Sequence, residues 1–189
     1  MVFRLLFRSN GYMTIALHFE QIIAVDLDQA WQSLHQDLSL LPVDLPHVRH
    51  IRELTREPGT SGPARIDFAW GIEHTVVPAV ARPFLRDLLD EVRSDTHWHH
   101  QARRVEFLFY SEALRELLNC HGEFVLDAQG ANTRMRFTGD LDISPQALPG
   151  VPKLLARTIM PAVERVVRDS ISPPLEALPG ALQKRIQTV

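Results

Sequence analysis

The sequence has a single cysteine, Cys120, among 189 residues, so the chain cannot form an internal disulfide. It has no apolar run near the roughly 20 residues that a membrane-spanning helix needs. Positive charge is also not in excess, because 20 Lys and Arg residues stand against 23 Asp and Glu residues, for a formal net charge of −3. The basic residues are scattered, unlike the basic stripe of a nucleic-acid-binding protein. These absences predict a cytoplasmic protein with no nucleic-acid partner and no integral membrane segment.

Signature motifs of catalysis are missing as well. There is no phosphate-binding loop, serine nucleophile elbow or nucleotide fingerprint in a usable context. Cys120 lacks an activating partner, because its neighbour His121 points to the other face of a strand. His97 and His99 share a strand face around Trp98, but a zinc site normally needs three or four protein ligands. We therefore predict no metal and no cofactor here, with a histidine general acid or base left open as an alternative.

What the chain does have is a series of strand-like runs that alternate apolar and polar residues. The last run is the clearest: Met135 and Phe137 fall on one face, and Arg134 and Arg136 on the other. The repeated pattern predicts an antiparallel sheet with one continuous apolar face. The predicted strands are Thr14–Ile23, Val48–Leu54, a run through Ile66 and Trp70, a run beginning at Thr96–His100, Arg104–Tyr110, Cys120–Ala128 and Thr133–Ile143.

Helical spacing occurs at both ends of this series. Leu27–Leu38 is predicted to be a short helix capped by Asp26 or Asp28. Val151–Ile171 is predicted to be a long amphipathic helix, bent at Pro161, that lies across the apolar face of the sheet. Pro83–Val92 is either a further short helix or a lid-like loop. The predicted organisation is a disordered extension over residues 1–12, one domain over 13–175 and a C-terminal tail over 176–189.

These elements predict an α+β fold in which a curved antiparallel β-sheet grips a long C-terminal α-helix, with short helices after the first strand. The stretches Cys120–Leu126, Asn132–Leu141 and Leu148–Lys153 resemble the close of a START-like (SRPBCC, helix-grip) domain. Within that superfamily the chain is most similar to a bacterial branch related to polyketide cyclases and lipid-transfer domains. The resemblance implies the fold and a cavity between sheet and helix, but it assigns no catalytic residue.

The predicted site is therefore an apolar ligand-binding cavity. Its function is interpreted as non-catalytic binding or transport of a hydrophobic small molecule, of lipid, polycyclic or isoprenoid type. Two alternatives remain: a cyclase or dehydratase that uses the same cavity, and a protein-interaction module whose apolar residues form a collapsed core. The residues predicted to line the cavity are Phe68, Trp70, Phe107, Phe109, Phe124, Met135 and Phe137 of the sheet, and Leu155, Ile159 and Val163 of the helix.

Overall fold

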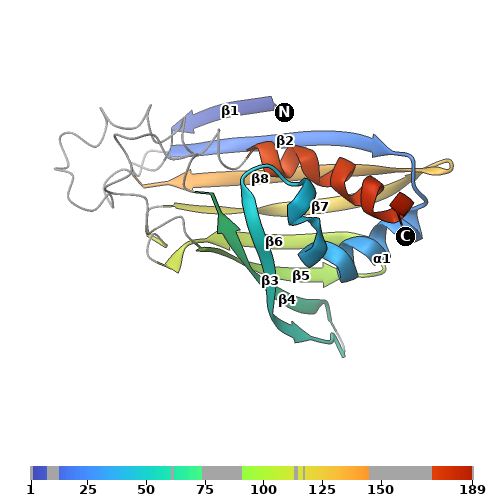
Figure 1. The fold of residues 1–189 in the computed structure, drawn as a ribbon. Coiled ribbons are helices and arrows are strands. Elements are labelled where there is room, and N and C mark those ends of the chain that lie inside the picture. The colour runs from blue at the N-terminus through green and yellow to red at the C-terminus, as the bar shows by residue number, and fades with distance from the viewer. Residues whose placement is uncertain are drawn as a thin grey trace.

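An eight-stranded antiparallel β-sheet forms most of the structure (Figure 1). The computed structural model describes residues 2–7, 13–60, 62–73, 91–112, 115–116, 118–144 and 172–188. The strands lie in the order β1-β2-β8-β7-β6-β5-β4-β3, so a meander from β3 to β8 is continued by β2 against β8. The strands are β1 (Val2–Phe7), β2 (Met13–Ile23), β3 (Val48–Glu57), β4 (Ala64–Ile72), β5 (Glu91–His99), β6 (Arg104–Tyr110), β7 (Leu118–Gln129) and β8 (Asn132–Ile143).

In the described part of the chain, two helices and a 3₁₀ segment accompany the sheet. Helix α1 spans Leu27–Asp37, and the 3₁₀ segment η1 spans Leu38–Asp44. As the sequence predicts, Asp26 caps α1, and its Oδ1 accepts hydrogen bonds from the backbone N–H groups of Asp28 at 2.9 Å and Gln29 at 3.4 Å. A C-terminal helix covers residues 172–188. In Figure 1 this helix runs along the ribbons of β2, β8 and β7, with α1 beside its C-terminal end. None of the helices described is long and apolar enough to cross a membrane.

The position of the C-terminal helix corrects one prediction. A tail was expected from residue 176, but residues 172–188 are helical and bury an apolar stripe. Leu175, Leu178, Ala181 and Leu182 recur at helical spacing and are at most 8% exposed. Burial of this stripe against the sheet is the physical reason that the segment is not a tail. The helix predicted over Val151–Ile171 lies outside the described residues, as does most of Pro83–Val92.

The N-terminal segment corrects a second prediction. Val2–Phe7 was expected to be disordered but forms strand β1, which pairs antiparallel with β2 from Val2 opposite His18 to Phe7 opposite Met13. Without β1, strand β2 would present an unpaired row of backbone donors and acceptors at the edge of the sheet. Strand β1 is stabilised by pairing with these groups, and the composition of the first residues does not reveal this pairing.

The inner face of the sheet is apolar in the register that the alternation predicts. Met135, Phe137, Leu141 and Ile143 of β8 are all 0% exposed. Arg134 and Arg136 lie on the outer face, with side chains 30% and 37% exposed. The α+β fold class and the facing of β8 are therefore confirmed. Residues Leu155, Ile159 and Val163, which β8 was expected to face, lie outside the described part of the chain.

Candidate functional site

A small cavity of about 40 Å³ lies between the inner face of the sheet and the two helices. Leu34 and Leu38 close it from the α1 side, and Leu175 and Leu178 close it from the C-terminal helix. The sheet supplies the rest of the lining: Phe68, Trp70, Ser94, Thr96, Trp98, Val105, Phe107, Phe109 and Phe124. The lining is therefore assembled from three elements that are far apart in the sequence.

The structure divides the predicted site residues into three groups. Phe68, Trp70, Phe107, Phe109 and Phe124 are brought together in the lining. Met135 and Phe137 are fully buried but do not line the cavity. Leu155, Ile159 and Val163 lie outside the described residues.

Aromatic rings pack against one another along the inner face. Phe137 lies against Phe19, Phe107 and Phe124, with ring centroids 5.1, 5.1 and 4.8 Å apart. Trp70 and Phe109 meet edge to face at 5.4 Å. The sheet is thus solidly packed around Phe137, and Phe107 and Phe124 both contact that ring and line the cavity.

Two of the described lining residues, Ser94 and Thr96, carry buried hydroxyl groups. Ser94 is 0% exposed, and its Oγ accepts a hydrogen bond from Trp70 Nε1 at 2.9 Å. Thr96 is 5% exposed, and its Oγ1 accepts from Trp98 Nε1 at 2.7 Å while donating to the carbonyl of Ile66. These bonds satisfy indole groups that would otherwise be buried without a partner. Ser94 and Thr96 were not among the residues predicted to line the cavity, although their parity with Trp98 places all three on one face of β5.

The histidines of β5 lie on the polar outer face of the sheet. His97 is exposed, and His99 Nε2 lies 3.4 Å from Glu106 Oε1. Trp98, between them in sequence, is 2% exposed and points to the inner face. Among the described residues no group of three His, Cys, Asp or Glu side chains is placed to hold a metal ion.

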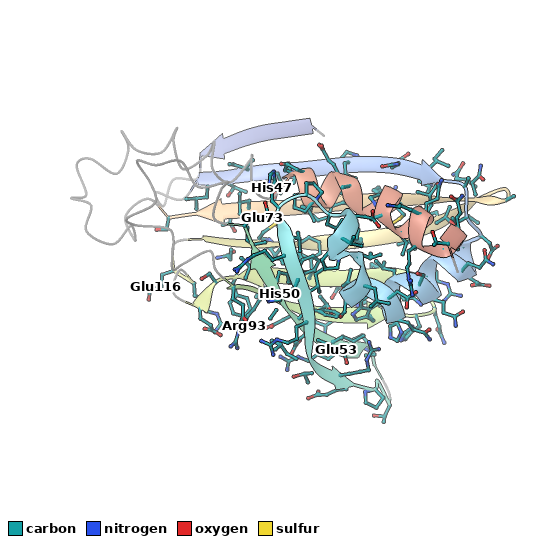
Figure 2. The ribbon with its side chains drawn as sticks, viewed as in Figure 1. His47, His50, Glu53, Glu73, Arg93 and Glu116 are labelled. Atoms are coloured by element: carbon teal, nitrogen blue, oxygen red, sulfur yellow. The ribbon has the colours of Figure 1, made fainter. Side chains whose placement is uncertain are left out.

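Polar side chains also follow β3 at the edge of the sheet (Figure 2). His47 Nδ1 lies 3.6 Å from Glu73 Oε2, and the N–H of Glu73 donates to the carbonyl of His47 at 2.9 Å. The ring of His50 occupies the space above Gly71, where an added Cβ would lie 2.3 Å from that ring. Glu53 pairs with Arg56 at 2.7 Å. These groups are outside the cavity lining, and exposed ion pairs of this kind add little stability.

Cys120 is a buried thiol on the inner face and is 2% exposed. Burial raises the pKa of Cys120 to about 12, and the charges of Asp140 and Asp142 contribute in the same direction. The thiolate is the nucleophilic form, so this side chain is held in its unreactive state.

We expect native protein to be inert to a thiol reagent such as 5,5′-dithiobis(2-nitrobenzoate) at about pH 8, because almost no thiolate is present and the reagent cannot reach it. The measurement is the release of thionitrobenzoate with and without guanidinium chloride. The unfolded chain is the control and should react once per molecule, because Cys120 is its single cysteine. Stoichiometric reaction of the native protein within minutes would contradict the placement of this thiol.

No protein-family model and no curated protein sequence matches the chain. Solved structures do match it, over nearly its whole length. An aromatase/cyclase from a Streptomyces species has a TM-score of 0.63 at 12% identity, covering 92% of this chain and 94% of its own. Norcoclaurine synthase from Thalictrum flavum has a TM-score of 0.58 at 13% identity, covering 95% and 90%. A START superfamily protein from Mycobacterium smegmatis has a TM-score of 0.51 at 11% identity, covering 92% and 97%. The chain therefore has the START-like helix-grip fold that its sequence resembles.

Proposed function

We propose that this protein binds a hydrophobic small molecule, of lipid, polycyclic or isoprenoid type, between the inner face of the sheet and the two helices. The observation that carries the proposal is the lining of the cavity. Its described part is formed by aromatic, leucine and valine side chains, and the hydroxyl groups of Ser94 and Thr96 accept hydrogen bonds from the indole N–H groups of Trp70 and Trp98. Predominantly apolar walls are typical of small-molecule sites. The single cysteine, which needs no oxidising compartment, supports a cytoplasmic location for this binding.

The size of the cavity sets a condition on binding. At about 40 Å³ it has room for a few water molecules, whereas sites for drug-sized ligands enclose roughly 300–1,000 Å³. A ligand of the proposed class must therefore displace part of the lining. The helices are the elements to move, because the C-terminal helix and the continuous α1–η1 segment each meet the cavity through two leucine side chains and not through a backbone ladder.

A cyclase-type enzyme is the second candidate, favoured by the aromatase/cyclase and the norcoclaurine synthase among the similar structures. Such an enzyme needs at least one acid or base positioned beside the substrate. The described lining contains hydroxyl, indole and hydrocarbon groups and no titratable side chain near neutral pH. This composition supports binding as the first choice. The discriminating experiment is native mass spectrometry of protein purified from its own host, in which a binding protein should carry an unmodified lipophile.

We expect Phe109→Ala to change the dissociation constant of a neutral apolar probe, such as N-phenyl-1-naphthylamine, by roughly fivefold or more, because the ring forms part of the cavity wall. Leu108→Ala is the matched control, since Leu108 is the preceding residue of β6 and points to the outer face. Fluorescence titration of both variants measures the effect. Equal affinities in the two variants would show that the probe binds elsewhere and would count against the proposed site.

A further inference from the structure

Helix α1 covers one side of the cavity, and two histidines take part in its contacts with the rest of the fold. Leu34 and Leu38 point into the cavity, while His35 lies beside them in the sequence. The ring of His35 meets Trp98, a lining residue, edge to face with centroids 5.1 Å apart. It also meets His100, in the turn after β5, at 4.9 Å. We call His35 and His100 the histidine pair.

The hydrogen bonds of the histidine pair fix its protonation. Trp31 Nε1 on α1 donates to His100 Nδ1 at 3.1 Å. An indole nitrogen only donates, so His100 Nδ1 must carry a lone pair. Arg56 Nη1 on β3 lies 3.2 Å from His35 Nε2, and a guanidinium group also only donates. Both contacts therefore require neutral imidazoles as acceptors, His35 with its proton on Nδ1 and His100 with its proton on Nε2.

An imidazolium at His35 would find no unpaired carboxylate among the described residues that face it. Glu53 is held by Arg56 at 2.7 Å, and Asp28 by Arg103. The remaining acid on this side, Asp37, accepts a hydrogen bond from Ser33 at 3.0 Å and lies 3.7 Å from Arg185 Nε on the C-terminal helix. Burial, together with the charges of Arg56 and His100, lowers the pKa of His35 to about 4, and Glu53 partly opposes this shift.

We propose that the histidine pair is an acid-sensitive latch, in which neutral imidazoles hold α1 over the cavity and protonation of His35 releases the helix and opens the cavity. Protonation turns the acceptor of Arg56 into a second donor, so the contact becomes a repulsion between cations. The release of α1 is inferred from the contacts of the helix alone. Its consequence for ligand exchange rests on the proposed function of the cavity.

The direction of the effect follows from linkage. A released His35 regains the ordinary imidazole pKa of about 6.5, whereas the closed state holds it near 4, so the released state binds more protons over the window between these two values. Acidification from about pH 7.5 to about pH 5 therefore favours release. Because the side chain is only partly buried, we expect an increase on the order of tenfold in the opening equilibrium, below the roughly thirtyfold that the full shift would give.

Hydrogen exchange of the α1 amides, measured by mass spectrometry and corrected for the pH dependence of intrinsic exchange, tests the latch without any ligand. Wild-type protein should lose about tenfold in protection over α1 between about pH 7.5 and about pH 5. His35→Gln should lose none in this window, because its amide oxygen accepts from Arg56 and cannot be protonated. His97→Gln, on the exposed outer face, is the matched control and should behave as wild type. Equal losses in wild type and His35→Gln would overturn the latch.

Uptake of N-phenyl-1-naphthylamine, which stays neutral over this pH range, separates the latch from the function of the cavity. If wild type but not His35→Gln takes up the probe as α1 is released, both proposals are supported. If α1 is released in the wild type without probe uptake, the latch is supported and the proposed binding function fails. If His35→Gln does not fold, the protonation state of the His35 ring in the wild type tests the latch instead. Nitrogen-15 NMR at about pH 7 should find the Nδ1-protonated form of His35, and the Nε2-protonated form or an imidazolium would overturn the latch.

Discussion

Replacing Phe137 with alanine is expected to lower the free energy of unfolding by about 3–5 kcal/mol. The ring is 0% exposed and lies against Phe19, Phe107 and Phe124, with centroids 5.1, 5.1 and 4.8 Å apart. These neighbours belong to three other strands, β2, β6 and β7, and cannot all move into the space that the ring leaves. The loss therefore combines the transfer of the ring to water with an unfilled cavity.

Arg136→Ala is the matched control, because Arg136 is the neighbouring residue of β8 on the opposite face. Its guanidinium lies 3.3 Å from Asp127 with a side chain 37% exposed, and such a pair contributes about 0–1 kcal/mol. Urea unfolding of both variants measures the two losses. A greater loss for Arg136→Ala would contradict the facing of β8. A loss below about 1 kcal/mol for Phe137→Ala would show that the ring lies in loosely packed space.

The sequence could predict the facing of β8 because a strand has a period of two. A slip of one residue would bury Arg134 and Arg136 and expose Met135 and Phe137. One continuous apolar face then requires a partner layer, which is why the α+β class was also predictable. The same period places Phe68, Trp70, Phe107, Phe109 and Phe124 on the inner face. It does not say which of these rings meet one another and which leave space.

The C-terminal helix could not be located from periodicity alone. Two successive segments, Val151–Ile171 and residues 172–188, both carry apolar residues at helical spacing. Pro179 lies inside the second segment, where proline disfavours a helix. Burial of Leu175, Leu178 and Leu182 against the fold outweighs that local preference. The contact between His35 and His100 could not be predicted from the sequence for a related reason. The two residues are separated by 65 positions and meet only through the tertiary fold.

Gly122→Ala is expected to cost about 3 kcal/mol, at the upper end of the usual range for overpacking. Gly122 on β7 pairs with Gly139 on β8. A Cβ added at Gly122 would lie 2.1 Å from the carbonyl oxygen of Thr138 and 2.5 Å from Cα of Gly139. Both are backbone atoms, so relief requires the two strands to separate where they share their ladder. The entropy that alanine removes from the unfolded chain, about 0.4–1 kcal/mol, does not offset this clash.

Gly139→Ala is the contrasting substitution, and the pair tests why two glycines face each other here. A Cβ at Gly139 would meet the ring tips of Phe137 at 3.2 Å and Phe107 at 3.3 Å, and the carbonyl oxygen of His121 at 3.1 Å. Side-chain rings can shift by a few tenths of an ångström, so the expected loss is about 1 kcal/mol.

The two glycines should also differ in how they couple to Phe137, because substitutions that share a contact are not additive. In a Phe137→Ala background the cost of Gly139→Ala should fall, since one of the rings that it meets is gone. The cost of Gly122→Ala should stay the same, since its clash is with backbone. Urea unfolding of the single and double variants gives both coupling energies. If Gly122→Ala couples with Phe137→Ala as strongly as Gly139→Ala does, both glycines make room for the stacked rings. The expected difference would mean that Gly122 allows the close approach of β7 to β8, whereas Gly139 makes room for the rings.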